Sequence, residues 1–499
     1  MASESFDVLI LGGGTAGCVL ADRLSEDASR RVGLVEAGPD YGHREERRWP
    51  EDMADARTLA TSHDWGFEEP GAGRARIVGG CSAHNACLVV WGSVADYDEW
   101  SPLTGGAWDF AGLEPYLRRG QERLRTRAHT DEELSAWDRA FLDACDEAGF
   151  ASLDDINDPG KGEGAGTFPI NASGSVRWNT SFAYLDPARA RDNLTVLPGT
   201  LIDRVEVRGD RVTGARVIRG GRAEVLRADS FALAAGSYGS PAVLLRSGIG
   251  PPGVLGELDI PVALSLGGVG EGLTDHYGSY LEFRPTEDLL AETTKQLSRG
   301  LLYQTTSVLK ARTSTSPDGS WDLHVLAWTD TVEEPRTSSG PGFHHYLSVK
   351  MLKPRSRGVV RLHSSDPAAL PAIHQGFLSA HEDIHTLTEG LRLVARLART
   401  ESIGRVVSET IGPGEGASDE DLAAYGRETA AGYFHPVGTC RMAPEDDPSA
   451  VVDASARVHG LANLFVVDAS IIPTIPRANT NLTVVAVAER LAEGILAES

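Results

Sequence analysis

Three glycines near the N-terminus, Gly12, Gly14 and Gly17, form the pattern GxGxxG between an apolar run and a segment with helical spacing. Glycines at these positions allow a tight turn, close approach of the backbone to a pyrophosphate and close packing of the following helix. The N-terminus of that helix offers N–H groups and a favourable dipole to phosphates. Glu36 follows about 20 residues after Gly17, at the end of the next predicted strand, which suits a carboxylate that binds ribose hydroxyls. The pattern predicts a dinucleotide site and leaves FAD and NAD as candidates.

Two histidines stand where their residue type needs an explanation. His84 lies among glycines, small residues and hydrophobes in "RIVGGCSAHNACLVVWG". Three roles are open for it: a buried structural imidazole, a catalyst, or a group that holds a cofactor. His435 lies in "YFHPVGT", where the following proline limits the backbone and presents the ring from a loop. An imidazole there is either structural or a base that takes up a proton.

The surrounding elements form an α/β pattern. Residues 6–11, 18–26 and 31–38 predict the strand, helix and strand of a βαβ unit. Alternating valines and isoleucines on both sides of "RGDR" within 193–218 predict a β-hairpin. Residues 230–250 read as a buried strand, a glycine turn and a helix, and the chain closes with a strand in 463–470 and a helix over 481–498.

Composition narrows the class of protein. A chain of 499 residues exceeds the length that a single hydrophobic core usually serves, so two domains are expected. The 47 basic and 71 acidic residues give a net charge of −24, which disfavours nucleic acid and anionic membranes and slightly favours a cationic substrate. Five scattered cysteines argue against disulfides and a structural zinc site, and no metal site is expected. The absence of a long apolar run and of a signal segment predicts a cytoplasmic protein without a membrane span.

Several ordered motifs together resemble the glucose-methanol-choline (GMC) oxidoreductases, a family of FAD enzymes. They are "VLILGGGTAGCVLADRLSE", "VGGCSAHN", "DYDEW", "SPAVLLRSGIGP", "VGEGLTDH", "HPVGTCRM" and the C-terminal "FVVDASIIPTIPRANTNLTVVAVAERLAEGI". The resemblance implies a Rossmann-like FAD-binding domain with an inserted substrate domain of antiparallel sheet and helices. The FAD-binding domain would comprise residues 1–100, 193–277 and 455–499, and the substrate domain residues 101–192 and 278–454.

The resemblance also implies a set of cofactor-binding residues. Those at the pyrophosphate and adenosine end would be Gly12, Gly14, Thr15, Ala16, Gly17, Glu36, Val205 through its backbone, Asp468 and Ala469. Those around the flavin would be Gly80, His84, Asn85, Ala86, Asn479 and Thr480. An alternative for Asp468 is a helix N-cap, because "DAS" precedes a polar turn.

By the same resemblance His435 is the active-site base and Asn481 its partner. An asparagine can bind the substrate oxygen but cannot take its proton at neutral pH. The implied reaction is oxidation of an alcohol to an aldehyde or ketone, with oxygen as acceptor. The alternatives are a dehydrogenase that passes electrons to a quinone or protein carrier, and a lyase that cleaves cyanohydrins without net redox. The expected partners are a small-molecule alcohol and the electron acceptor, and the protein would be a monomer or homodimer.

The segment around His84 is most similar to choline oxidases, in which the matching histidine is bonded to the flavin. His84 is therefore either a covalent anchor for FAD or an imidazole packed against the flavin. Choline itself is doubtful as substrate, because Ala86 replaces a serine and Lys353, if it faces the substrate rather than solvent, would repel a quaternary ammonium. Tyr433 stands where choline oxidases have a small valine associated with oxygen reactivity.

Overall fold

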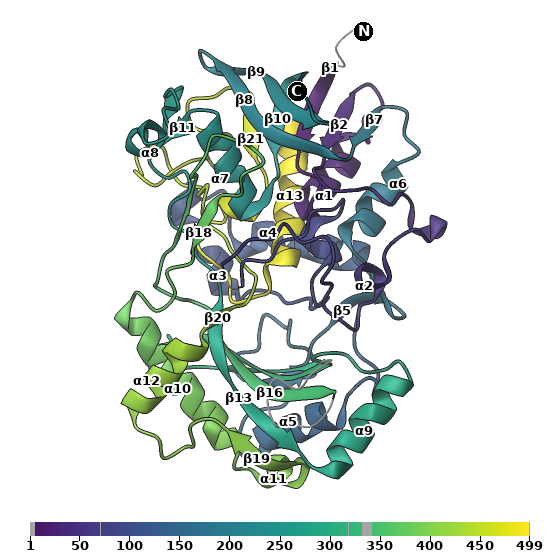
Figure 1. Cartoon of the computed structure of the whole chain (residues 1–499), viewed down its shortest axis with the longest axis vertical. Coiled ribbons are helices and arrows are strands. Elements are labelled where there is room, and N and C mark those ends of the chain that lie inside the picture. Colours follow the sequence, from purple (N-terminus) through teal and green to yellow (C-terminus); the bar gives the residue numbers. More distant parts are fainter. Residues whose placement is uncertain (1–4, 70, 318, 332–341, 499) are drawn as a thin grey trace.

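Two sheets lie at opposite ends of the molecule's long axis, with loops and short helices between them (Figure 1). The computed structural model of the chain describes residues 5–69, 71–317, 319–331 and 342–498. The upper half holds both described chain ends, and a layer of helices covers the lower sheet from below (Figure 1). The predicted α/β fold, a Rossmann-like domain plus an antiparallel sheet with helices, is confirmed.

The upper sheet has seven strands in the order β7–β2–β1–β10–β9–β8, with β21 added to β10. Its bounds are β1 Ser5–Leu11, β2 Val32–Val35, β7 Leu194–Leu197, β8 Thr200–Arg208, β9 Arg211–Arg219, β10 Arg222–Leu233 and β21 Leu464–Val466. The pairings of β7, β2, β1, β10 and β21 are parallel, whereas β8, β9 and the first half of β10 form an antiparallel meander. The predicted hairpin turns at Gly209, where φ is +63°.

Helices pack against this sheet and against one another. The main ones are α1 Thr15–Leu24, α3 Val94–Asp98, α4 Phe110–Arg123, α7 Gly236–Arg246 and α13 Thr480–Glu498. Helix α13 lies between α1 and α4, and its N-terminal end points down toward the middle of the molecule (Figure 1). The predicted domain boundaries stay a prediction; α4, which they assign to the substrate domain, lies against α13.

The lower sheet also has seven strands, all antiparallel, in the order β19–β13–β16–β15–β14–β4, with β20 added to β13. Its bounds are β4 Gly164–Thr167, β13 Tyr277–Pro285, β14 Ser307–Ala311, β15 Leu323–Thr331, β16 Phe343–Met351, β19 Val407–Ile411 and β20 Ala431–Gly432. The helices around it are α5 Ala136–Glu147, α9 Glu287–Ser298, α10 His381–Leu397, α11 Glu401–Val406 and α12 Asp419–Thr429.

The two faces of the lower sheet have different surroundings because successive side chains of a strand point to opposite sides. Leu323, Val325, Leu347 and Val349 belong to the core formed with α5 and α10. The alternate residues Leu326 and Trp328, with Tyr346 packed beside them, cluster instead with Leu88, Val90 and Tyr433 from the middle layer. This second face is therefore turned toward the upper half.

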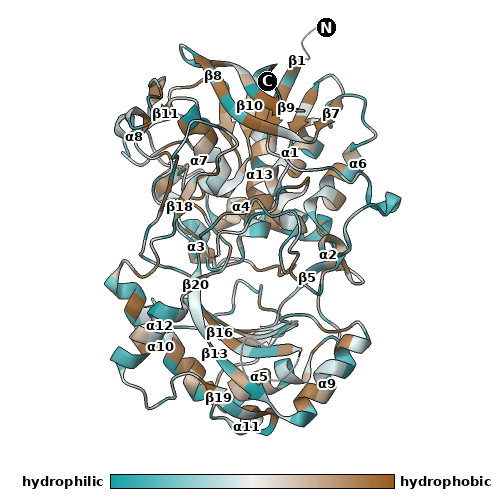
Figure 2. Cartoon of the chain, in the orientation of Figure 1, coloured by the Kyte–Doolittle hydropathy of each residue, from teal (hydrophilic) through white to brown (hydrophobic). Residues whose placement is uncertain are grey.

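Short elements complete the chain. They are α2 Glu51–Ala54, α6 Asp186–Ala188, α8 Pro252–Gly256, β3 Thr126–Arg127, β5 Ile170–Ser173, β6 Val176–Arg177, β11 Ile249–Gly250, β12 Leu264–Ser265, β17 Val359–Arg361 and β18 Ala372–His374, with single turns η1 Arg44–Glu46, η2 Gly80–Ala83, η3 Pro102–Thr104, η4 Ser181–Leu185 and η5 Ala469–Ile471. Figure 2 shows hydrophobic strands around α13, whereas α9, α10 and α12 alternate between hydrophilic and hydrophobic residues. Among the described residues no helix combines the length and apolar character needed to cross a bilayer.

Candidate active site

In the glycine turn between β1 and α1, Gly12 and Gly17 pack against backbone of the protein, whereas Gly14 has an open side. A Cβ at Gly12, where φ is +121°, would lie 2.4 Å from the carbonyl oxygen of Ala234, and one at Gly17 would lie 1.9 Å from that of Gly12. A Cβ at Gly14 would have Cα of Gly80, 3.8 Å away, as its nearest neighbour. The N-terminus of α1 has no side-chain cap. The open side of Gly14 and the uncapped helix fit a pyrophosphate.

Glu36 directly follows β2 and lies beside this turn. Its carboxylate accepts hydrogen bonds from the N–H groups of Gly13, at 2.9 Å, and Gly38, at 2.7 Å. Burial raises the pKa of Glu36 from 4.5 to about 7, against the lowering effect of the two backbone donors. Further donors, such as ribose hydroxyls, would favour the ionised carboxylate, so this position fits an adenosine ribose.

His435 lies in a buried cluster where the upper half meets the lower sheet. Its Nε2 is 3.2 Å from the side-chain nitrogen of Asn479, and its Nδ1 is 3.0 Å from Nδ1 of His276. An amide nitrogen only donates, so Nε2 of His435 accepts, and in a neutral ring Nδ1 then carries the proton and donates to His276. The geometry leaves the basic lone pair of His435 on Nε2, beside Asn479.

Neighbouring groups keep His435 neutral and fix its backbone. Burial is the main reason that the pKa of His435 lies well below its usual value, and it lowers the pKa of His276 to about 3. The N–H of His435 donates to Asp275 at 2.7 Å, and burial raises the pKa of that carboxyl to about 7. Phe434, just before His435, has φ of +63°, a conformation that only a well-determined loop maintains. His435 is thus a held, unprotonated imidazole.

The structure places Asn479, rather than the predicted partner Asn481, beside His435. The side-chain carbonyl of Asn481 accepts a hydrogen bond of 3.2 Å from Thr15 Oγ1, at the start of α1. The amide at His435 belongs to Asn479. The two asparagines flank Thr480, the first residue of α13, and positions two apart on a helix do not share a face. Asn481 therefore points to the glycine turn and Asn479 to His435.

The "DYDEW" segment supports the loop that carries Asn479. Asp96 is fully buried, accepts a hydrogen bond of 2.8 Å from the N–H of Arg477 and forms an ion pair with the guanidinium of the same residue. Lys353 lies 3.4 Å from Asp96 and forms an ion pair with Glu99. Lys353 therefore belongs to this support, where two carboxylates engage its ammonium group.

Comparison with family models decides the family. Models described as GMC oxidoreductase match residues 6–278 and 354–488. The chain belongs to the GMC oxidoreductase family. It is 31% identical to an oxygen-dependent choline dehydrogenase of Photobacterium profundum, over 99% of this chain and 93% of that protein. It is 30% identical to the mitochondrial choline dehydrogenase of Mus musculus, over 99% of this chain and 90% of the relative.

Solved structures agree with the fold. The crystal structure of pyridoxine 4-oxidase from Mesorbium loti superposes with a TM-score of 0.87 and 26% identity, covering 98% of this chain and 99% of the other. As a GMC oxidoreductase the protein is an enzyme and uses FAD as cofactor. The turn at Gly14 and the carboxylate of Glu36 would hold its pyrophosphate and adenosine ribose.

The residues predicted around the flavin converge on the middle layer. A Cβ at Gly80 would lie 2.6 Å from Cα of Gly14, so this turn meets the pyrophosphate turn directly. His84, half-buried at the end of η2, has Nε2 3.0 Å from the carbonyl oxygen of Ser62, and burial lowers its pKa. Asn85 accepts from the N–H of Cys87 at 3.0 Å, and Ala86 packs against the cluster of Tyr433 and Trp328. Flavin contact and covalent attachment stay predictions.

Two further predicted residues are already engaged with the protein. The N–H of Val205 donates to Ser247 Oγ at 2.9 Å. The carboxylate of Asp468 accepts from the N–H of Gly236 at 2.9 Å and from that of Ser470 at 2.8 Å, and so caps the short helix η5 that starts at Ala469. The N-cap alternative for Asp468 is confirmed, whereas its contact with FAD stays a prediction.

Sequence reasoning missed several residues of the His435 cluster. Asp275 and His276 end the "VGEGLTDH" motif, which contributed to the resemblance without a role for either. Lys350 and His324 come from β16 and β15. The alternation of side chains along these strands could have placed both residues on the face of Trp328.

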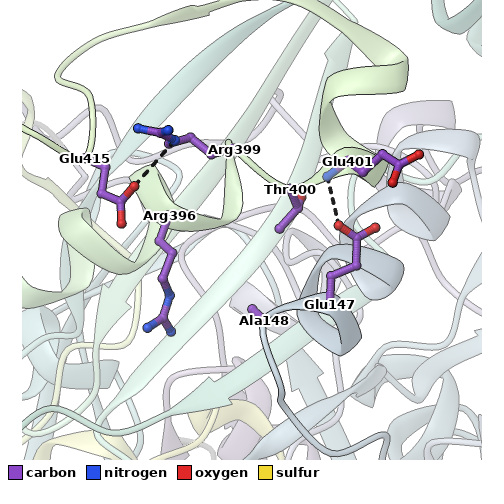
Figure 3. Close-up of a pocket in the computed structure, with 7 residues that line it drawn as sticks. All are labelled: Glu147, Ala148, Arg396, Arg399, Thr400, Glu401 and Glu415. Atoms are coloured by element: carbon purple, nitrogen blue, oxygen red, sulfur yellow. Dashed lines mark hydrogen bonds and ion pairs between the residues drawn. The ribbon is translucent and has the colours of Figure 1, made fainter.

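A surface hollow lies elsewhere, between α5 and the segment that joins α10 to α11 (Figure 3). Its lining is Glu147, Ala148, Arg396, Arg399, Thr400, Glu401 and Glu415. Glu147 accepts from the N–H of Glu401 at 2.8 Å, and Arg399 lies 3.5 Å from Glu415 (Figure 3). The hollow is on the helical side of the lower sheet and contains no predicted site residue.

Proposed function

We propose that the enzyme oxidises an alcohol to an aldehyde or ketone, with His435 as the base and Asn479 as its partner at the substrate oxygen. The observation that carries the proposal is the neutral His435 whose acceptor Nε2 lies beside a single amide donor. Nε2 takes the hydroxyl proton, and Asn479 orients the oxygen by hydrogen bonding. When bound, FAD supplies the two-electron acceptor that receives the hydride from the adjacent carbon.

The other residues of the cluster hold the base in position. His276 accepts a hydrogen bond from the Nδ1–H of His435 and so keeps the lone pair of His435 on Nε2. Asp275 fixes the backbone of His435 by accepting a hydrogen bond from its N–H. The names of the relatives, choline dehydrogenase and pyridoxine 4-oxidase, support a small-molecule substrate.

Oxygen is the proposed electron acceptor, and a quinone or carrier protein is the second candidate. The observation that favours the second is Tyr433, whose ring centre lies 4.4 Å from that of His435 and occupies space beside the base. A large ring there restricts access for oxygen.

Anaerobic mixing with a panel of alcohols tests the function. Loss of flavin absorbance supports alcohol oxidation, whereas a flavin that stays oxidised while substrate is consumed supports the lyase. Subsequent addition of oxygen separates oxidase from dehydrogenase by the rate of reoxidation. His435→Ala should keep its flavin and reduce it roughly 10²–10⁴-fold more slowly; a normal rate in this variant contradicts the assignment.

A further inference from the structure

A row of basic side chains crosses three strands of the lower sheet. Lys310 of β14 pairs in register with His324 of β15, which pairs with Lys350 of β16. Residues directly opposite one another on neighbouring strands share a face, and this is the face of Leu326 and Trp328. The row therefore lies on the side of the sheet that is turned to His435.

Lys350 reaches the His435 cluster through Tyr433. Its ammonium nitrogen lies 5.7 Å from the centre of the Tyr433 ring, which in turn packs against His435. Within the described parts of the chain this ammonium makes neither a hydrogen bond nor an ion pair. Burial lowers the pKa of Lys350 to about 8, so the side chain still carries its charge at neutral pH. The side chain is only partly buried, so this ammonium is accessible to an anionic group.

His324 adds a second unsatisfied group next to Lys350. The side chain is 1% exposed, and neither ring nitrogen has a hydrogen-bond partner among the described residues. A buried donor without a partner is costly, and a carboxylate that displaced the present packing around His324 would supply the missing acceptor. Lys310 differs, because it donates to the carbonyl of Ile156 at 3.1 Å and lies 4.2 Å from the ring centre of Trp321.

The charged groups around Lys350 leave this region positive. The carboxyl that faces Lys350 is that of Asp275, which also faces Arg74. One of its oxygens accepts from the N–H of His435, and the other has no hydrogen-bond partner among the described residues. Two cations thus share one carboxyl whose ionisation burial opposes. An anionic ligand would balance this excess.

We propose that the substrate is a hydroxy acid whose carboxylate binds Lys350 and His324 while its hydroxyl lies at His435 and Asn479. This inference rests on the proposed alcohol oxidation at His435. The carbinol carbon becomes a carbonyl: its hydrogen would leave with two electrons as a hydride to bound FAD, the hydroxyl proton passes to His435, and the carboxylate is unchanged. The local positive charge opposes the cationic substrate that the net charge of −24 favoured.

Flavin absorbance titrations with acetate, acetamide and tetramethylammonium, at constant ionic strength, test the site without turnover. Acetate should bind about tenfold or more tightly than acetamide, because a charge-assisted hydrogen bond to an ammonium is lost in the amide. Lys350→Gln should remove this preference, and Lys350→Arg should retain part of it. The matched control is Lys295→Gln, at an exposed position of α9, which should bind acetate as the wild type does. Tighter binding of tetramethylammonium, or unchanged acetate binding in Lys350→Gln, overturns the inference.

A second variant protects the test against misfolding. If Lys350→Gln loses its flavin, His324→Gln should still weaken acetate more than acetamide, and an equal effect on both would overturn the inference. A protein that no alcohol reduces, but whose acetate binding depends on Lys350, would refute the proposed function and retain the anion site. If neutral alcohols reduce the flavin rapidly and acetate binding does not depend on Lys350, the proposed function is retained and the anion site is refuted.

Discussion

The side-chain nitrogen of Asn479 lies 3.2 Å from Nε2 of His435, although the two residues come from different segments of the chain. One is on the loop before α13 and the other on the loop that follows β20. Their contact fixes which nitrogen of His435 accepts a proton, because the amide nitrogen is only a donor. It also separates the tasks of the two asparagines that flank Thr480.

Replacement of Asn479 should impair chemistry, and replacement of Asn481 should impair cofactor binding. Asn479→Ala removes a donor at the reacting oxygen, so flavin reduction by substrate should slow roughly 10²-fold or more. Asn481→Ala, the matched control, loses only the hydrogen bond from Thr15 and should weaken FAD retention with a nearly normal reduction rate. Stopped-flow reduction and flavin content measure the two effects. The reverse pattern would restore the pairing predicted from sequence.

His276 is expected to act as a positioning residue through the tautomer of His435. His276→Leu removes the acceptor of the Nδ1 proton, and loss of such an orienting partner costs about 10–100-fold in rate. His276→Asn supplies a carbonyl oxygen to the same proton and should recover part of the rate. The pH dependence of flavin reduction is the added readout, since the leucine variant should shift it and a purely structural role would not. Equal rates in both variants would contradict this role.

The fold could be predicted, and His435 could be proposed as the base, because both depend on local patterns. The glycines after β1, the carboxylate of Glu36 and the His-Pro segment at His435 each occupy a few consecutive residues with their own chemistry. The surroundings of His435 were not predictable in this way. The choice between Asn479 and Asn481 depends on where α13 begins, and a shift of two residues rotates a side chain to another face.

Long-range packing determines the remaining residues of the cluster. His276 meets His435 across 159 positions of the sequence, and only tertiary structure brings them together. From the sequence, Lys353 faced either the substrate or solvent, whereas in the structure Lys350 is the lysine on the sheet face turned to His435. Three positions along a strand and its following loop reverse the direction of a side chain, and the ion pairs of Lys353 with Asp96 and Glu99 could not be read from spacing.

Glu36 should make the flavin-free protein less stable as pH rises. Its pKa is raised from 4.5 in the unfolded chain to about 7 in the folded one, so the folded state binds the proton more tightly. The stability from this group is fully present below pH 4.5 and is lost as pH rises through about 7. The difference in thermal midpoint between the wild type and Glu36→Gln should therefore decrease as pH rises from 4.5 through about 7. A constant difference between the two would contradict the raised pKa.

Arg177 should be important for stability rather than chemistry. Its guanidinium is fully buried and donates to the carbonyls of Met53, at 3.1 Å, and of Asp55 and Thr58, both at 2.6 Å. Arg177→Met leaves these acceptors unpaired, at about 1–3 kcal/mol each, and should lower the thermal midpoint clearly. Arg208→Met, at an exposed hairpin end, is the control and should change it little. Equal midpoints for the two variants would show that the buried bonds contribute nothing.

His84 is expected to hold FAD covalently. Burial lowers the pKa of the imidazole, so it is neutral and has a nitrogen lone pair for bond formation. After acid precipitation the flavin should stay with the denatured wild-type chain, and the intact mass should exceed that of the chain by the mass of the flavin. His84→Ala should release all flavin into the supernatant. Cys81→Ser, which removes the neighbouring nucleophile in η2, should keep it attached. Release of flavin from the wild-type protein would leave His84 as a packed, unbonded imidazole.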